Sequence, residues 1–126
     1  MSMRLDLPWL EPAWQRVQRS RERGRMPHAL LLTGPRGVGK RHFARALAAA
    51  LLCAEPDRSG QACGHCTPCG WFAAGSHPDW LELEPEEPGK AIRIDAVRGL
   101  CQTLTLTGHV AGQDGVTRRV AAIRPA

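Results

Sequence analysis

The sequence contains no tyrosine, two phenylalanines and only two lysines among its 17 basic residues. It also lacks a long apolar run. The longest apolar stretches are residues 29–32 and 46–54, whereas a membrane-spanning helix needs about 20 apolar residues. The first residues contain no apolar signal core. We therefore expect no membrane span and a location in the reducing cytoplasm, where the five cysteines bind metal or carry out chemistry rather than form disulfides.

Internal repeats and low-complexity linkers are also absent, and 126 residues fit one small domain. Hydrophobic residues make up 43% and charged residues 23%, which is the mix of a globular domain rather than of a disordered chain. The net charge of +5 is unevenly spread, because residues 1–45 sum to +7, residues 46–90 to −5 and residues 91–126 to +3. The basic first third could serve nucleic acid, nucleotide phosphate or an acidic partner. The acidic middle argues against a uniform DNA-coating surface.

The first half of the chain predicts a helix, a strand and a second helix. Residues 11–23 begin with Glu11-Pro12, a favourable helix start. Arginines at positions 16, 19 and 23 form one stripe on this helix, which we interpret as a solvated face rather than a DNA-binding surface. Residues 29–33 form an apolar run with the length of a buried parallel strand, and residues 41–52 repeat apolar side chains at helical spacing.

The second half predicts shorter elements separated by turns. In chain order they are a helix near residues 71–74, a half-exposed strand at 80–84, a surface turn at 85–89, a short strand at 92–94 and a last strand near 119–124. Pro78 ends the predicted helix near residues 71–74. Between the last two strands we expect a helix that is capped by Asp95, runs through Leu104 and ends at Gly108.

A glycine-rich segment between the predicted strand and helix matches the pattern G-x-x-x-x-G-K. It comprises Gly34, Pro35, Arg36, Gly37, Val38, Gly39, Lys40 and Arg41. The glycines let backbone N–H groups converge on phosphate oxygens, the following helix contributes its positive N-terminus, and Lys40 adds a full charge. We interpret the segment as a present or former nucleotide-binding loop. The alternative is a simple strand-to-helix turn that binds nothing.

The loop departs from the pattern at its last position, where Arg41 replaces the serine or threonine that ligates Mg²⁺. An arginine side chain has no acceptor atom and cannot ligate a metal ion. Because phosphoryl transfer depends on that ion, we expect severely impaired hydrolysis, while ATP binding stays open. The sequence contains no persuasive nucleophile, base or carboxylate pair elsewhere, so we assign no catalytic residue.

Four cysteines around two overlapping C-x-x-C units form a second motif: Cys53, Cys63, Cys66 and Cys69. Thiolates at this spacing converge on one ion through tight turns, and four of them suit structural zinc. Iron–sulfur ligation and free thiols stay open as alternatives, although the fourth Cys-Pro of a ferredoxin run is missing. We interpret His65 and His77 as loop residues rather than ligands, and Cys101 as an ordinary buried side chain.

A phosphate loop whose helix leads into a four-cysteine module resembles the clamp-loader subunits of bacterial DNA polymerase III, which are AAA+ proteins. The stretches that carry the resemblance fall within residues 9–124, and they are residues 26–32, the loop at 34–40, the four cysteines, Ser76-His77-Pro78-Asp79 and Ile94-Asp95-Ala96-Val97-Arg98. The resemblance implies an α/β P-loop NTPase (AAA+) fold, with three αβα layers and a parallel sheet. Residues 1–126 would then form a partial AAA+ N-terminal domain, with a zinc-binding module inserted at residues 53–69.

The resemblance also implies a function. Motor subunits of this family (gamma/tau) keep a hydroxyl after the loop lysine, whereas another kind of subunit often has a degenerate nucleotide site. Arg41 and the run at residues 71–80 favour the second kind. We expect a non-catalytic clamp-loader subunit of the replicative DNA polymerase III complex, with structural zinc, no polymerase activity and partners that comprise gamma/tau, delta, the sliding clamp and primed DNA. The alternatives are an ATP-hydrolysing motor subunit and a zinc-dependent nucleic-acid-binding module.

The same resemblance implies that part of the sheet lies outside the sequence. AAA+ sheets are ordered 5-1-4-3-2, and this chain has candidates for the first three strands only. The acidic Walker B signature is missing after residues 121–124, and the fourth strand would lie between the first and the third. We therefore expect a fragment that is truncated after the third strand, without lid and collar domains, whose unpaired strand edges favour aggregation.

Overall fold

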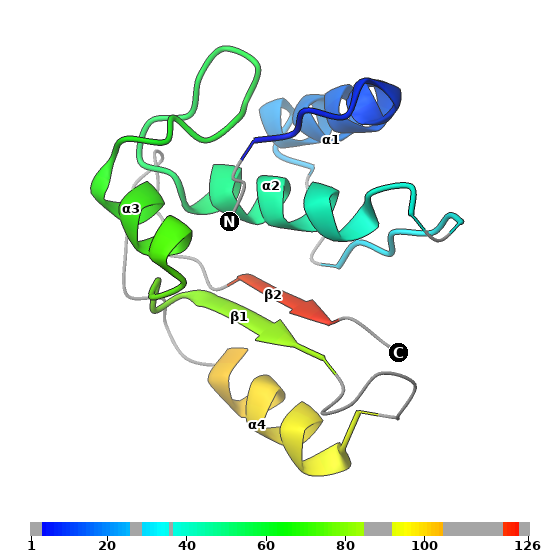
Figure 1. Ribbon diagram of the computed structural model, residues 1–126, viewed down its shortest axis with the longest axis vertical. Coiled ribbons are helices and arrows are strands. Elements are labelled where there is room, and N and C mark those ends of the chain that lie inside the picture. The colour runs from blue at the N-terminus through cyan, green and yellow to red at the C-terminus, as the bar shows by residue number, and fades with distance from the viewer. Residues whose placement is uncertain (1–3, 26–28, 36, 85–91, 105–119, 124–126) are drawn as a thin grey trace.

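A computed structural model describes residues 4–25, 29–35, 37–84, 92–104 and 120–123 (Figure 1). A short 3-10 turn, Pro8–Leu10, precedes the first helix. The elements that follow are α1 (Glu11–Glu22), α2 (Lys40–Leu52), α3 (Thr67–Ala74), β1 (Trp80–Leu83), α4 (Ile94–Leu104) and β2 (Val120–Ile123). These residues form a mixed α/β structure, which confirms the predicted class. No helix in the described ranges combines the length and the apolarity needed to cross a membrane.

The two strands pair in parallel, with Trp80 opposite Val120 and Leu83 opposite Ile123. The Val120 N–H also donates to the Asp79 carbonyl oxygen, 2.8 Å away, just before the ladder begins. Helix α2 lies on one side of the strands and α4 on the other (Figure 1). Parallel strands are ordinarily buried on both faces, so helices on both sides are the cover that such a pair requires.

Helix α2 is central because its short alanine side chains let neighbours approach on two sides. Residues 46–50 are all buried. On one side, the Phe43 ring packs edge-on against Trp14 of α1, with ring centroids 5.7 Å apart. On the other side, Leu52 packs in a second core with Phe72 of α3. The helix therefore fixes the glycine loop at its start relative to the cysteine-rich segment at its end.

The predicted strand at residues 29–33 is wrong, because the structure has no strand there and the Leu31 side chain is 88% exposed. Leu30 is also exposed, whereas Leu32 packs against the core between α1 and α2. A strand is stabilised by hydrogen bonds to a neighbouring strand. In the part of the chain that the structure describes, β1 and β2 pair with each other and no third strand lies beside residues 29–33. An apolar run alone cannot supply the missing neighbour.

The region of α4 needs two corrections. Residues 92–94 are not a strand, because Ile94 is the first residue of α4 and Asp95 lies inside its first turn rather than at its N-cap. Cys101 is exposed rather than buried. Each strand of the sheet is four residues long, so the sheet covers only part of the apolar face of α4.

The other elements lie close to their predicted positions. Helix α1 ends one residue earlier than expected, α2 begins one residue earlier, and β1 and β2 occupy the predicted segments. Helix α3 begins at Thr67 and is ended by Gly75, whose φ is 77°, before the chain reaches Pro78. Glycine adopts this left-handed conformation without strain, which explains why it ends the helix first. The predicted turn at residues 85–89 and the predicted helix end at Gly108 lie outside the described residues.

Candidate functional site

The structure brings the four cysteines of the C-x-x-C motif together at the end of α2. Cys53 follows the last residue of α2, Cys63 lies in the next loop, and Cys66 and Cys69 lie at the start of α3. Their Sγ atoms all lie within 4.8 Å of one another. The Cys53 Sγ is 3.5 Å from that of Cys63 and 3.8 Å from that of Cys66, and the Cys63 and Cys69 sulfurs are 3.9 Å apart.

Backbone N–H groups donate to three of the sulfurs. The N–H of Cys63 donates to Cys53 Sγ, that of Cys66 to Cys63 Sγ and that of Cys69 to Cys66 Sγ, over 3.4, 3.3 and 3.4 Å. Each of these bonds favours the thiolate, because the N–H dipole is directed at the negative charge. Cys66 is also the N-cap of α3, where the helix N-terminus adds positive potential. The local backbone is therefore arranged to stabilise anionic sulfur.

The thiols differ in acidity. Burial raises the pKa of Cys69, and it also raises the pKa of Cys53. At Cys63 burial acts in the same direction, but it is outweighed by hydrogen bonds from the backbone N–H groups of His65 and Cys66 and from neighbouring thiols, which lower the pKa to about 6. A metal ion at this site would thus displace protons from the two buried thiols and meet Cys63 as a thiolate at neutral pH.

The donor set fits a single tetrahedral metal ion. With metal–sulfur bonds of about 2.3 Å, tetrahedral geometry places the sulfurs about 3.8 Å apart. Three of the sulfur pairs are 3.5, 3.8 and 3.9 Å apart, and all four sulfurs lie within 4.8 Å of one another. Neither His65 nor His77 belongs to the group. Four thiolates complete a tetrahedron and leave no position for a reactive water molecule. The arrangement could therefore hold an ion as a structural element.

The predicted phosphate loop leads directly into α2. Gly39 precedes the helix with a φ of 104°, and the Leu7 side chain occupies the space that a β-carbon at this position would need. Glycine alone satisfies both the backbone angle and the close approach. The Lys40 Nζ donates to the Gly34 carbonyl oxygen, 2.8 Å away. Pro35, Gly37 and Val38 complete the described part of the loop, and Arg36 lies outside the described residues.

Arg41, in place of the hydroxyl residue, pairs with strand β1. Its Nε lies 3.5 Å from Oε1 of Glu82. Arg45, one turn further along α2, has its Nη2 3.1 Å from both oxygens of the same carboxylate. The Glu82 side chain is only 21% exposed, so this cluster is partly shielded from water. The guanidinium at the predicted Mg²⁺ position is thus neutralised by a carboxylate of the sheet.

Some residues that hold these features were not predicted from the sequence. Glu82 was expected only as a member of an alternating strand. Gln61, which is 7% exposed and exchanges hydrogen bonds with the backbone of Leu5, belongs to no motif. An isolated polar residue gives no local signal, because its partner lies 56 residues away.

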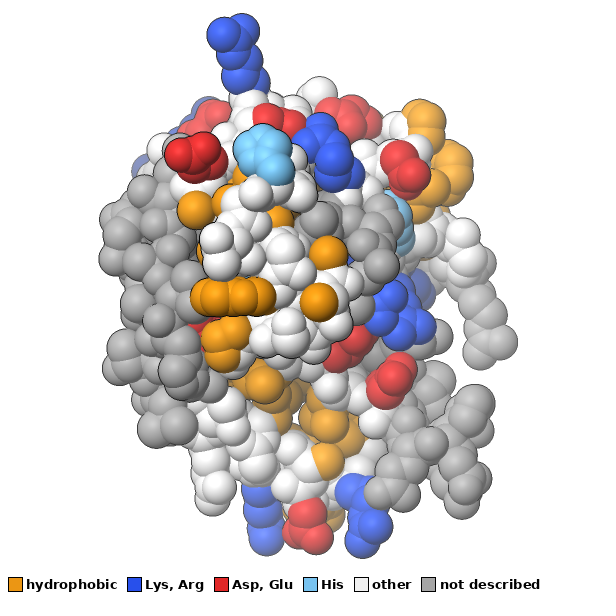
Figure 2. Space-filling view, turned by 60° about the vertical axis from the view of Figure 1, so that its left-hand side comes forward, with side chains coloured by type: hydrophobic (Ala, Val, Ile, Leu, Met, Phe, Trp, Pro, Cys, Tyr) orange, Lys and Arg blue, Asp and Glu red, His pale blue; other side chains and the backbone are white. Residues whose placement is uncertain are grey.

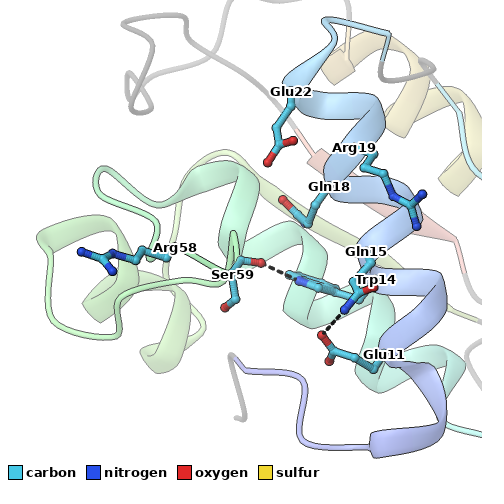
Figure 3. Close-up of a pocket in the computed structure, with 8 residues that line it drawn as sticks. All are labelled: Glu11, Trp14, Gln15, Gln18, Arg19, Glu22, Arg58 and Ser59. Carbon is cyan, nitrogen blue, oxygen red and sulfur yellow. Dashed lines mark hydrogen bonds between the residues drawn. The ribbon is translucent and has the colours of Figure 1, made fainter.

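A separate pocket of about 320 Å³ lies between α1 and the loop that precedes the last three cysteines of the cluster (Figure 3). Trp14 lines it and donates from Nε1 to the Ser59 carbonyl oxygen over 3.0 Å. Arg19, Glu22 and Arg58 also line it, so its charged groups have both signs. Figure 2 shows a face whose centre is mostly uncharged, with acidic and basic side chains scattered around its margin. Neither feature presents a continuous charged surface.

A glycine loop that enters a central helix, a parallel strand pair between helices and an attached cysteine module fit an AAA+-like α/β domain, which is the class of the family that matches the chain. The family model described as "DNA polymerase III, delta subunit" matches residues 9–118. The chain belongs to this family.

Three relatives give the same result. The DNA polymerase III subunit delta' of Pseudomonas aeruginosa is 43% identical over 119 residues, which cover 94% of this chain and 34% of the relative. The delta' subunits of Escherichia coli K12 and Yersinia pestis are 36% identical over 105 residues and 37% identical over 98 residues, covering 83% and 77% of this chain and 31% and 28% of the relatives. The chain thus spans about a third of the length of the curated relatives it matches. These relatives are delta' subunits, which confirms the prediction from Arg41 and residues 71–80 that the chain is not of the gamma/tau kind.

Proposed function

We propose that the chain is part of a non-hydrolysing clamp-loader subunit, which helps to place the sliding clamp on primed DNA in the cytoplasm. Its partners in this proposal are the gamma/tau and delta subunits of the loader. Family membership and the delta' relatives support the clamp-loader role. The observation that carries the non-hydrolysing assignment is the pairing of Arg41 with Glu82.

The chemistry of the loop supports this assignment. Hydrolysis in P-loop proteins requires a Mg²⁺ ion that bridges the β- and γ-phosphates and is held by the hydroxyl after the loop lysine. Arg41 offers only N–H donors, and its Nε lies 3.5 Å from Oε1 of Glu82. Lys40 remains, so the loop keeps a cation for phosphate while lacking the ligand for the metal. Such a site can hold an anion without activating it.

We also propose that the four cysteines bind one structural zinc ion. The sulfur separations support zinc, because they match a tetrahedron around a single ion. An iron–sulfur cluster places several iron and sulfide atoms between the thiolates, which must then stand further apart. In this proposal the ion joins the end of α2 to the start of α3 and has no catalytic role.

Steady-state ATP hydrolysis by the chain, measured with Mg²⁺ present, tests the non-hydrolysing assignment. Lys40→Ala serves as the control for contaminating ATPases. We expect the two proteins to share the same background rate. Turnover that is present in the chain and absent in Lys40→Ala would favour an ATP-hydrolysing motor subunit instead.

The partner assignment has its own test. The chain is mixed with purified gamma/tau and delta subunits and passed over a size-exclusion column. We expect it to elute with the larger assembly. Elution as a separate species at micromolar concentrations would contradict these partners for this part of the protein.

A further inference from the structure

We propose that residues 4–10, here called the N-terminal strap, couple the metal centre to the phosphate loop. The strap contacts the loop that delivers Cys63 at one end and the glycine loop before α2 at the other. Occupancy of the cysteine cluster would therefore change the mobility of the phosphate loop. This inference rests on the proposed metal ion.

The first end of the strap holds the chain just before Cys63. The Leu5 N–H donates to Gln61 Oε1 over 2.6 Å, and Gln61 Nε2 donates back to the Leu5 carbonyl oxygen over 3.2 Å. The Arg4 Nη1 donates to the Ala62 carbonyl oxygen over 2.9 Å. Leu5 and Gln61 are each 7% exposed and Ala62 is fully buried. Buried hydrogen bonds of this kind are costly to break, so this end is held firmly.

Asp57 stabilises the conformation of the loop before Cys63, which the strap contacts. Its Oδ1 accepts hydrogen bonds from the N–H groups of Ser59 and Gln61, over 2.9 and 3.0 Å. Its Oδ2 lies 2.7 Å from Arg4 Nη1. The same carboxylate therefore organises the loop and binds the strap. Movement of either one disturbs the other.

The second end of the strap contacts the phosphate loop and the first turn of α2. Asp6 Oδ1 lies 2.9 Å from Nε2 of His42 in that turn. The Leu7 side chain packs directly on the backbone of Gly39. The Trp9 Nε1 donates to the Val38 carbonyl oxygen over 2.7 Å. Leu7 and Trp9 thus hold the loop backbone on which a phosphate group would rest, and Asp6 holds the first turn of α2.

The two ends of the strap are so close along the chain that a displacement of one end must move the other. Leu5 and Leu7 are two residues apart, and two extended residues span at most about 7 Å. A bound ion would tie Cys63 to Cys53, and Cys63 directly follows the Gln61-Ala62 pair that the strap contacts. Loss of the ion would free this loop, loosen Leu5 and release Leu7 from Gly39. Coupling between two sites is reciprocal, so a ligand on the phosphate loop would also tighten the metal centre.

Amide hydrogen exchange of a peptide that covers residues 34–43 tests the coupling. It is measured on the zinc-loaded chain and on the chain stripped with a chelator, with zinc content read by native mass spectrometry. We expect stripping to raise exchange by about fivefold or more, the lower end of the usual coupling between linked sites. Gln61→Ala should raise exchange similarly in the loaded chain, and stripping this variant should then add little.

Matched variants separate the strap from general destabilisation. Gln15→Ala, on the exposed side of α1, should exchange like the unchanged chain. Trp9→Phe removes the donor to Val38 and keeps an aromatic ring, so it should raise exchange in the loop without loss of zinc, even if Gln61→Ala does not fold.

The outcomes that overturn the proposal are distinct from failure of the metal assignment. Unchanged exchange at residues 34–43 after verified loss of zinc overturns the coupling. If the chain never binds zinc, the metal assignment fails, and the strap is judged by Gln61→Ala and Trp9→Phe alone. Unchanged exchange in both variants would overturn the strap, and raised exchange in either would support its mechanical role.

Discussion

The Nζ of Lys40 donates a hydrogen bond to the carbonyl oxygen of Gly34, 2.8 Å away. The two residues stand at opposite ends of the glycine loop, so the lysine closes the loop on itself. A phosphate group that enters the loop has to replace this bond with one to its own oxygen. Lys40 would attract the phosphate but lose its hydrogen bond to Gly34 in the same step, so the free energy gained on phosphate binding is smaller.

Restoring the hydroxyl should make nucleotide binding sensitive to Mg²⁺. Arg41→Thr supplies a metal ligand next to Lys40 and removes one guanidinium from Glu82. In calorimetric titrations with ATP, we expect this variant to bind about tenfold more tightly with Mg²⁺ than with a chelator, which corresponds to about 1.4 kcal/mol. The unchanged chain should show no preference for Mg²⁺.

Arg45→Thr is the matched control for this experiment, because Arg45 pairs with the same carboxylate one turn further from the loop. It should not acquire sensitivity to Mg²⁺. Equal sensitivity in the two variants would show that release of Glu82, rather than the new hydroxyl, is responsible.

Two serine variants should separate the metal ligands from the fifth cysteine. Cys69 is 1% exposed and lies in the cluster, whereas Cys101 is exposed on α4. We expect Cys69→Ser to lose the zinc ion but to keep most of its helical circular dichroism, because the core around Trp14 and Phe43 that joins α1 to α2 contains none of the four cysteines. Cys101→Ser should keep one zinc ion per chain and the same melting temperature. Retention of zinc by Cys69→Ser would remove it from the ligand set.

The carboxylate between the two arginines should contribute to stability. Glu82→Gln leaves Arg41 and Arg45 without their charged partner in a partly buried position. We expect the free energy of unfolding in urea to fall by about 1 to 2 kcal/mol. Glu22→Gln, at an exposed position on α1, should cost less than about 0.5 kcal/mol. Equal effects of the two substitutions would show that the cluster contributes no more than an ordinary surface charge.

His77 should make stability depend on pH. Its side chain is buried, and burial lowers the pKa of His77 below 6.5, against the opposing charge of Asp79. Above pH 6.5 the folded and unfolded states are both neutral at this residue. Below pH 6.5 the unfolded state binds a proton first, so the free energy of unfolding falls as the pH falls, by up to about 1.4 kcal/mol per pH unit. This loss of stability ends once the pH is below the lowered pKa of His77 in the folded state.

His77→Asn tests this assignment, because an Asn side chain offers an acceptor for the N–H of Asp79 but does not titrate. Urea unfolding between pH 5 and 8 should give a flatter profile than that of the unchanged chain. His65→Asn, at an exposed position, should leave the profile unaltered. An unaltered profile in His77→Asn would assign the pH dependence to another group.

The features that could be predicted from the sequence are those whose causes are local. The apolar residues of α2 recur about once per helical turn, and α1 starts at Glu11-Pro12. Both signals are local, and both helices occur within a residue of their predicted bounds. The three cysteines from Cys63 to Cys69 fit within seven residues, so the spacing alone brought them together. Cys53 directly follows α2, so the predicted end of that helix also gave its position.

The features that could not be predicted depend on distant partners. The apolar run at residues 29–33 has strand composition, but a strand needs a neighbour, and composition does not reveal whether one is present. Leu5 and Gln61 lie 56 residues apart and exchange their hydrogen bonds without any recurring pattern. The pairing of Glu82 with Arg41 similarly depends on how α2 crosses the sheet, which only the folded structure defines.

The parallel register of β1 and β2 has a consequence for how the chain acquires its structure. Trp80 pairs with Val120, about 40 residues later, and closing a loop of that length costs about 3 kcal/mol of chain entropy. The cysteines that surround the metal site are joined through contacts 3 to 13 residues apart. During synthesis from the N-terminus, the metal site can therefore assemble on the ribosome before the second strand has been made, and the sheet closes last on a module that is already formed.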